Sequence, residues 1–514
     1  MEASCDILIV GGGTGGCAAA MAACSLGYRV VMTEETDWVG GQLTSQAVPP
    51  DEHQWVETHG CTLRYRQFRE AVRKYYRDHF PLTDQARNNK LLNPGNGWVS
   101  RLCFSPRVGL AVLTGMLARY RATGQLQIWH QCVPISATVD GDRVTSVRVI
   151  DTDTGLETDV TFGFVLDATE IGDLLPMTGT EYRVGAESQA EFGEMDAPEV
   201  ANPRDIQAFT WCLCVGFDPA GGRAPIEKPQ QYDYWKSFEP VMEPRWTGKL
   251  FSWTFFDAIS NSDKRIKFLG KTGMFSYRRI IDSSIFETFS HDYSMINWVQ
   301  NDHFDAVIDE PEDRTAVVYE NARQQSLSIL YWLQTEAERD DGGIGYSELY
   351  AAGDPVGTRD GLAMAPYHRE SRRIKARFTM TEAHVGKDMR PDGAVEFWDS
   401  IGIGSYRMDL HPSASGRNGI DNDAWPYQVP LGSLVPERMT NLLPACKNIG
   451  VTHIANGCTR LHPTEWNIGE AAGLLAAYCL GDEITPQGVY EDRNRVVEFQ
   501  NLCVAQGIEI EWPS

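Results

Sequence analysis

The sequence predicts an α/β fold in which a parallel sheet, extended by a β-meander, is interrupted along the chain by a second, α+β lobe. Three observations carry this prediction. An apolar run near residue 10 leads directly into a glycine-rich turn and an alanine-rich segment, and a strand-and-turn pattern spans residues 126–170. The chain also has 514 residues, which is too long for one ordinary hydrophobic core.

The glycine-rich turn has the spacing of a Rossmann-like dinucleotide site. It reads G-x-G-x-x-G at Gly11, Gly13 and Gly16, a helix of small residues follows to Gly27, and the next strand ends at Glu34, 18 positions after Gly16. The glycines permit a tight turn and close approach to a pyrophosphate, which the helix N-terminus attracts, while the acid accepts hydrogen bonds from a ribose diol. We therefore expect dinucleotide contacts from a set that also includes Thr14, Gly15 and Glu35. The alternative is a turn that kept the fold and lost the ligand.

The residues after Glu34 favour FAD over NAD. A second glycine pair appears in "DWVGGQLTSQ", where the Gly41 and Gln42 backbone can approach the isoalloxazine end of an extended ligand. From residue 126 a strand and a meander with turns at Asp140-Gly141 and Thr154-Gly155 lead back into the sheet at "FGFVLDATE". This meander, closed by Ala168, Thr169 and Glu170, is similar to the crossover of FAD-binding folds of the glutathione-reductase type.

The C-terminal part of the chain predicts the rest of this lobe. "NLLPACKNIG" reads as a strand, and a later helix carries Gly469, Ala471 and Ala472 on its early turns, with its N-terminus directed at the flavin pyrimidine edge. We therefore expect a discontinuous FAD-binding domain of residues 1–50, 98–200 and 426–514. Residues 51–97 and 201–425 then form the substrate or cap domain.

Five stretches together carry a family resemblance: "CDILIVGGGTGGCAAA", "TDWVGGQLTSQ", "LDATEIGDLLPMTG", "PYHRESRRI" and "TRLHPTEWNIGEAAG". They resemble FAD-dependent oxidoreductases distantly related to the succinate dehydrogenase and fumarate reductase flavoproteins. The resemblance implies FAD as cofactor, with Val133 among its contacts, an oxidoreductase activity and two lobes. It implies no substrate.

Composition excludes several other classes of function. The formal net charge is −24, which argues against nucleic acid or an anionic membrane surface as a partner. The longest apolar stretches are shorter than a membrane span, and the first strand begins too early to leave room for a signal peptide. The 12 cysteines show no metal-ligand spacing and no redox CxxC, so we expect no metal and a reducing, cytoplasmic setting.

Removing a hydride from a carbinol carbon requires a base, and histidine is the natural one. His462 is the first candidate because it immediately precedes the helix directed at the flavin, followed by His368 and His411. Arg369 and Arg460 could hold a carboxylate or stabilise anionic reduced flavin; each of these side chains could equally be structural. A covalent flavin bond near His59 and Cys61 rests on residue type alone.

Three functions stay open. The favoured one oxidises a C–H next to a hydroxyl of a small sugar- or polyol-like substrate. Because the glycines at 342–345 do not form a second dinucleotide motif, we expect the substrate and not NAD(P)H to reduce the flavin. Oxygen or an electron carrier then takes the electrons. The aromatic-rich cap suits such a substrate, although core packing explains its rings equally well. The alternatives are flavin-dependent reduction of an unsaturated acid and a flavin-fold scaffold without catalysis. A homo-oligomer is compatible with each.

Overall fold

The computed structural model describes residues 1–257 and 262–513. Its centre is a five-stranded sheet in which every neighbouring pair is parallel. In spatial order the strands are β23 (Leu442–Pro444), β8 (Phe164–Asp167), β2 (Ile7–Val10), β3 (Val30–Thr33) and β4 (Leu126–Trp129). A strand from the C-terminal part of the chain therefore completes a sheet begun near the N-terminus, as predicted.

Helices cover one face of this sheet. They are α1 (Thr14–Ser25), α4 (Pro106–Ala122) and α12 (His462–Gly481), with α13 (Pro486–Glu491) and α14 (Arg493–Ala505) packed against α12. The small residues of α1 let α12 approach closely: a Cβ added to Gly469 would lie 2.1 Å from the Gly15 carbonyl oxygen. The spacing of the small residues in α1 and α12 therefore reflects the packing of these two helices in addition to the nucleotide turn.

The meander covers the other face. It is a four-stranded sheet in the order β1 (Glu2–Ser4), β7 (Glu157–Thr161), β6 (Arg143–Asp151) and β5 (Cys132–Asp140). Strand β2 is buried on both sides, since Ile7 and Ile9 join the core on the helix side while Leu8 and Val10 pack with the meander. The predicted turns are present, and their glycines adopt positive φ angles, +57° at Gly141 and +70° at Gly155.

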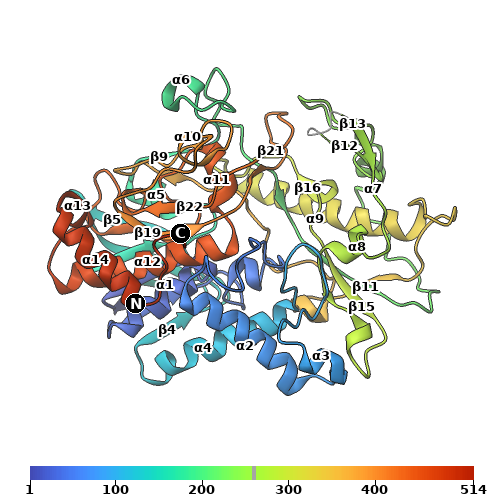
Figure 1. Cartoon of the computed structure of the whole chain (residues 1–514), viewed down its shortest axis with the longest axis horizontal. Coiled ribbons are helices and arrows are strands. Elements are labelled where there is room, and N and C mark those ends of the chain that lie inside the picture. The colour runs from blue at the N-terminus through green and yellow to red at the C-terminus, as the bar shows by residue number, and fades with distance from the viewer. Residues whose placement is uncertain (258–261, 514) are drawn as a thin grey trace.

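The second lobe lies on the right of Figure 1 and contains a four-stranded antiparallel sheet beside a long helix. Its strands are β14 (Arg279–Ile281), β15 (Asp292–Ile296), β11 (Leu213–Phe217) and β17 (Leu349–Ala351), and the helix is α9 (Glu312–Thr335). Trp235 and Trp298 are buried here, as core packing requires. The predicted domain boundaries themselves stay a prediction.

The remaining elements are short or connect the lobes. The two-stranded pairs are β9 (Tyr182–Arg183) with β18 (Arg373–Ile374), β10 (Phe209–Thr210) with β16 (Asp302–His303), β12 (Thr254–Asp257) with β13 (Ser262–Arg265), β19 (Ser400–Gly404) with β22 (Tyr427–Pro430), and β20 (Met408–Leu410) with β21 (Ile420–Asn422). The other helices are α2 (Leu63–His79), α3 (Asp84–Asn88), α5 (Leu174–Thr178), α6 (Gln189–Phe192), α7 (Tyr232–Ser237), α8 (Met274–Tyr277), α10 (Glu382–Val385) and α11 (His453–Thr459). The 3₁₀ turns are η1 (Gly41–Leu43), η2 (Ser283–Ile285), η3 (Val299–Asn301), η4 (Asp354–Val356) and η5 (Leu431–Ser433).

Two expectations about the chain as a whole can be compared with the structure. All 12 cysteines are free and buried, among them Cys212, which directly precedes β11, and Cys214 within it. Within residues 1–257 and 262–513, no helix has both the length and the apolar character needed to cross a bilayer.

Candidate active site

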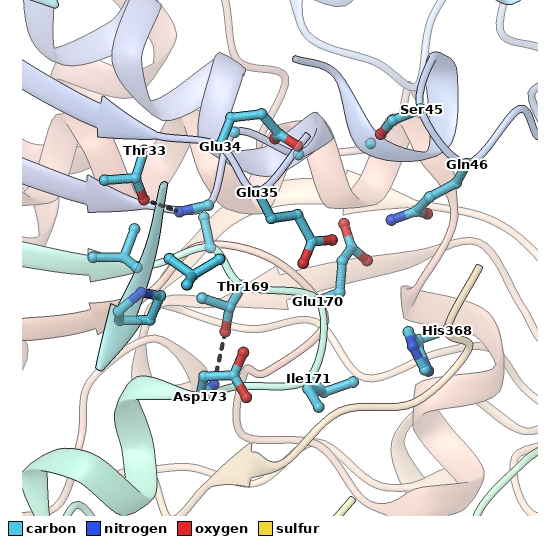
Figure 2. Close-up of a pocket in the computed structure, with 18 of the residues that line it drawn as sticks. Thr33, Glu34, Glu35, Ser45, Gln46, Thr169, Glu170, Ile171, Asp173 and His368 are labelled. Atoms are coloured by element: carbon cyan, nitrogen blue, oxygen red, sulfur yellow. Dashed lines mark hydrogen bonds between the residues drawn. The ribbon is translucent and has the colours of Figure 1, made fainter. Parts of the chain in front are cut away.

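A cleft opens at the carboxyl ends of β2, β3 and β8, where open parallel sheets bind their ligands (Figure 2). The space between its lining atoms is about 850 Å³, part of which is open solvent. Its walls are the glycine turn after β2, the acids after β3, the start of β5 and the loop after β8, and the second lobe adds Tyr319, Pro366 and His368. The cleft therefore lies between the two lobes.

The glycine turn packs closely on the loop after β8 and leads into an uncapped helix N-terminus. Gly11 has a φ of +103°, and a Cβ there would lie 2.2 Å from the Ala168 carbonyl oxygen. Helix α1 begins behind this turn with Gly13 as N-cap, without a side-chain cap and without an acid in its first turn. The first N–H groups of α1 are therefore available to an anion, as a pyrophosphate requires.

Carboxyl groups surround the middle of the cleft. Glu34 Oε1 accepts hydrogen bonds from the Thr36 N–H at 2.9 Å and the Thr36 hydroxyl at 2.7 Å. Burial, with a smaller contribution from Glu35, raises the pKa of Glu34 to about 8. Figure 2 shows Glu35 next to Glu170 in the same space, and burial together with Glu170 and Asp173 raises the pKa of Glu35 to about 7. A ribose diol placed here would donate to these oxygens.

The predicted cofactor contacts divide into two groups. Those that line the cleft are Gly11, Gly13, Glu34, Glu35, Gly41, Val133, Ala168, Thr169 and Glu170. Those that do not line it are Thr14, Gly15, Gly16, Gln42, Gly469, Ala471 and Ala472. Thr14 ties the two glycine segments together through its hydroxyl, which donates to the Gly40 carbonyl at 2.9 Å, and Gly469 packs on α1. For both, the contacts present are structural.

A buried lysine that the sequence reasoning missed lies beside the cleft. Lys447 Nζ forms ion pairs with Glu170 and, at 3.4 Å, with Glu465 Oε2. Burial alone would lower the pKa of Lys447, but the two carboxylates raise it above its ordinary value. Because Lys447 follows the parallel strand β23 by three residues, its position at the carboxyl edge of the sheet was the available signal.

A buried acceptor without a hydrogen-bond partner lines the cleft near Gly41, and a second one lies next to Gly41 outside the lining. Gln46 lines it, and its Oε1 is buried without a hydrogen-bond partner. Gln42 donates through Nε2 to Glu465 Oε2 at 2.5 Å and to the Arg460 carbonyl at 3.1 Å, and its Oε1 also lacks a partner. A bound group with N–H donors, such as the pyrimidine edge of a flavin, would satisfy acceptors of this kind. The residues present therefore fit FAD.

Two of the three histidines predicted as bases, His462 and His368, are buried. His462 Nδ1 accepts the Asp51 backbone N–H at 3.2 Å, and burial lowers the pKa of His462 to about 4. The neutral ring must then carry its proton on Nε2, so His462 offers a proton instead of accepting one. His368 lines the cleft and lies 3.0 Å from the Tyr319 hydroxyl, and burial, with Lys447 and Arg369, lowers its pKa to about 3. These surroundings do not favour either ring as a base at neutral pH.

The two predicted arginines are brought together by Tyr367. Arg460 Nη1 donates to the Tyr367 hydroxyl at 2.7 Å, and the Arg369 guanidinium stacks over the same ring at 5.0 Å. Each also has a carboxylate partner: Arg369 pairs with Asp302 at 3.0 Å and Arg460 with Asp409 at 3.3 Å. The rest of the "RESRR" motif is buried ion pairing, since Glu370 pairs with Arg373 within the motif.

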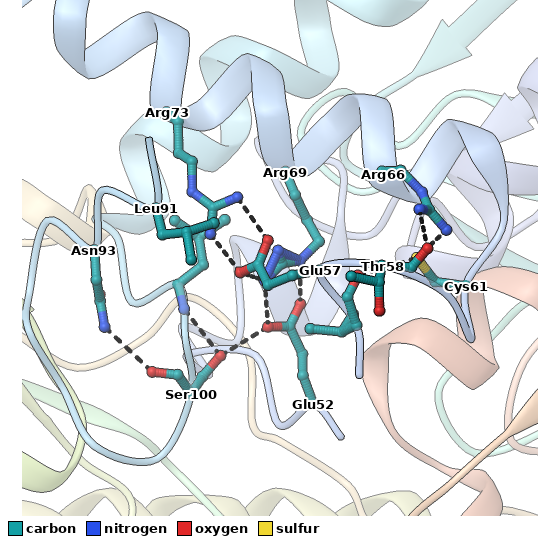
Figure 3. Close-up of polar contacts among 12 residues, drawn as sticks. Glu52, Glu57, Thr58, Cys61, Arg66, Arg69, Arg73, Leu91, Asn93 and Ser100 are labelled. Carbon is teal, nitrogen blue, oxygen red and sulfur yellow. Dashed lines mark hydrogen bonds and ion pairs between the residues drawn. The ribbon is translucent and has the colours of Figure 1, made fainter. Parts of the chain in front are cut away.

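A third buried arginine joins this region from the second lobe. Arg278 pairs with Asp51 at 3.3 Å, next to the backbone N–H that Asp51 gives to His462. The segment after Asp51 is anchored on α2 (Figure 3): Arg69 holds Glu52 through two hydrogen bonds, 2.9 and 3.1 Å long, and Arg69 also binds Glu57 at 2.8 Å. This network sets the position of Asp51. Neither His59 nor Cys61 lines the cleft, and burial raises the pKa of the Cys61 thiol to about 12.

Fold and cleft together define a dinucleotide-binding protein with the architecture of FAD enzymes. A family model described as FAD dependent oxidoreductase matches residues 6–502, and the chain belongs to this family. FAD is the cofactor that this membership indicates, and oxidoreductase is its class of activity. Membership in this family supports an enzyme over a flavin-free scaffold. Within residues 1–257 and 262–513, no group of three or more His, Cys, Asp or Glu side chains could hold a metal ion.

Solved structures similar to this chain come from several kinds of protein. A variant of FrdA from E. coli quinol fumarate reductase is 11% identical over 98% of this chain and 74% of that chain, with a TM-score of 0.34. A geranylgeranyl bacteriochlorophyll reductase-like protein from Thermoplasma acidophilum is 10% identical over 99% of this chain and 85% of that chain, with a TM-score of 0.32. L-proline dehydrogenase from P. horikoshii is 13% identical over 37% of this chain and only 25% of that chain, with a TM-score of 0.19. No curated protein sequence matches the chain.

Proposed function

We propose that the protein uses FAD to oxidise a C–H bond next to a hydroxyl group in a small, neutral, sugar- or polyol-like substrate. Bound FAD supplies the two-electron acceptor, at flavin N5, for the hydride that leaves this carbon. The protein's own groups bind and orient the substrate and take up the hydroxyl proton. Of the predicted residues, Arg460, Arg369 and His462 are proposed to line or support the substrate site, and His368 to contact the cofactor or substrate from the cleft wall.

We favour a neutral substrate because the three buried arginines are already paired with aspartates. Arg278, Arg369 and Arg460 each have an aspartate partner within 3.3 Å. A substrate carboxylate would have to compete with these aspartates for the guanidinium groups, and a buried charge that loses its partner is strongly unfavourable. Hydroxyl groups, by contrast, can donate to aspartates and accept from arginines without displacing either.

One observation favours the alternative, the reduction of an unsaturated acid. Nε of Arg278 and Nε of Arg460 are buried and have no hydrogen-bond partner. These two N–H donors would suit a carboxylate if Asp409, whose side chain is 31% exposed, turned away from Arg460. We rank this function second because it requires that rearrangement.

The two functions separate in an anaerobic experiment on the purified, FAD-loaded protein. We expect neutral polyols or sugars to bleach the visible flavin absorption, while carboxylic acids of similar size do not. Reoxidation of chemically reduced protein by an unsaturated acid, without bleaching by any neutral compound, would establish the alternative. Purified protein that is colourless and does not bind added FAD would contradict both.

Further details of the function belong to the same proposal. The 12 free, buried thiols support a reducing, cytoplasmic setting. Oxygen or an electron carrier is the proposed final acceptor, which makes the enzyme an oxidase or a dehydrogenase. The rate at which air restores the flavin colour after bleaching distinguishes these two cases.

A further inference from the structure

We propose that His411, held by Asp302, is the base that removes the hydroxyl proton of the substrate. This inference rests on the proposed oxidation of a carbinol carbon and assigns its proton-accepting atom, Nε2 of His411. It replaces His462, the first candidate from the sequence, in that role.

Asp302 and His411 form a closely bonded pair. His411 Nδ1 lies 2.5 Å from Asp302 Oδ2. The other carboxylate oxygen, Oδ1, accepts from the Thr210 hydroxyl at 2.5 Å and pairs with Arg369 Nη1 at 3.0 Å. Asp302 is fully buried. The carboxylate is thus held on both oxygens and orients the imidazole ring.

The ionisation of Asp302 determines the tautomer of His411. Burial alone would raise the pKa of Asp302, but Arg369 and His411 together hold it below its ordinary value. An ionised carboxylate only accepts hydrogen bonds, so Nδ1 of His411 must carry a proton. The neutral imidazole then presents a lone pair on Nε2, which forms no hydrogen bond among the described residues and lies 3.7 Å from the Asp409 carboxylate. This is the opposite of His462, whose Nδ1 is occupied by an N–H donor.

His411 is also accessible, and successive contacts connect it to a segment that lines the cleft. Its side chain is 20% exposed, whereas His462 is fully buried. Nε2 lies 3.7 Å from Asp409 Oδ2, and Asp409 pairs with Arg460, which bonds to Tyr367. Tyr367 sits in the chain between Pro366 and His368, which both line the cofactor cleft. A short series of contacts therefore joins Nε2 to the end of the cleft.

The proton and electrons balance in one oxidation step. The substrate O–H and the adjacent C–H bonds break, and a carbon–oxygen double bond forms. The hydroxyl proton moves to Nε2 of His411, and the carbon-bound hydrogen leaves with its electron pair to the two-electron acceptor that FAD supplies. Asp302 stabilises the imidazolium that results, as a buried carboxylate does beside a catalytic histidine.

The first test compares His411→Gln and Asp302→Asn with His384→Gln, a histidine outside this region, in anaerobic bleaching by the substrate found for the wild type. We expect bound FAD to be retained, and bleaching to slow by roughly 10²–10⁴-fold in His411→Gln. His384→Gln should keep the wild-type bleaching rate. A wild-type bleaching rate in His411→Gln would overturn the proposal.

A second readout does not depend on turnover. In ¹⁵N-histidine NMR of the FAD-loaded protein, His411 should be protonated on Nδ1 at neutral pH, with a strongly deshielded proton signal that disappears in both His411→Gln and Asp302→Asn. Protonation on Nε2 instead would overturn the proposal even if Asp302→Asn fails to fold. If no neutral compound bleaches the wild type, the proposed function fails, and the histidine spectrum still decides whether the Asp302–His411 pair is formed as described.

Discussion

Glu34 shows at the scale of one residue how the cleft is prepared for a ligand. Its carboxyl is buried, accepts hydrogen bonds only from Thr36 among the described residues, and has a pKa raised from 4.5 to about 8. An acid that ionises less readily in the folded protein than in the unfolded chain makes stability fall as pH rises. The loss begins near the ordinary pKa and ends near the raised one.

We therefore predict that FAD-free protein loses stability between about pH 4.5 and pH 8, by at most roughly 1.4 kcal/mol per pH unit from Glu34. Glu35, whose pKa is raised to about 7, contributes in the same direction. Thermal unfolding across this range is the measurement. Glu34→Gln should flatten the slope, and an unchanged slope in that variant would contradict the assignment.

At the scale of elements, the contact between α1 and α12 joins the N-terminal and C-terminal parts of the nucleotide lobe. Gly469 faces the backbone of Gly15, and Gly473 faces Ala19, so both helices need small residues at these positions. The contact supports the glycine turn from behind.

Gly469→Ala is predicted to destabilise the protein by ~1–3 kcal/mol and to weaken FAD binding, because its Cβ would lie 2.1 Å from the Gly15 carbonyl oxygen. Gly115→Ala is the matched control: Gly115 is an exposed position on α4 with nothing within 4 Å of an added Cβ. It should be neutral or stabilising by up to ~1 kcal/mol. The measurement is urea unfolding of both variants. Equal losses in the free energy of unfolding would show that the packing contact is unimportant.

The charged network between α2 and the segment that precedes it is the second element-scale feature. Arg69 and Glu52 are nearly fully buried, with exposed side-chain fractions of 2% and 1%. Arg69→Met is predicted to lower the free energy of unfolding by ~3–5 kcal/mol, because it leaves Glu52 buried without its cation. The double variant Glu52→Gln/Arg69→Met should recover part of this loss in urea unfolding. Strict additivity of the two changes would mean that the pair is not coupled.

For the whole molecule, the sequence predicted the nucleotide lobe well because its signals are local. The glycine turn, the strand ending at Glu34 and the meander with its return strand each occupy one short stretch, and all were found. Nine of the predicted cofactor contacts line the cleft for the same reason. Gly469 of α12 packs on α1, and sequence alone does not tell a close helix from a close ligand, so the assignment of the small α12 residues to the cofactor stays a prediction.

The substrate side could not be predicted in the same way. Asp302, Tyr367, Asp409 and His411 come from segments up to 109 residues apart, and their hydrogen bonds determine the tautomers on which the choice of base rests. From the sequence, we rank the candidate histidines by how near they are to helix α12. That ranking cannot reveal that the Asp51 backbone N–H occupies Nδ1 of His462. Tautomers depend on tertiary contacts.

As a whole, this FAD-dependent oxidoreductase is proposed to remove hydride from a carbon bearing a hydroxyl group in a neutral substrate. The decisive experiment is stopped-flow bleaching of the anaerobic, FAD-loaded protein by a neutral polyol or sugar, compared with the same compound deuterated at the carbinol carbon. We predict bleaching that is several-fold slower with deuterium. Bleaching at equal rates would contradict hydride removal from that carbon as the slow step, and a flavin that only unsaturated acids reoxidise would contradict the proposed oxidation itself.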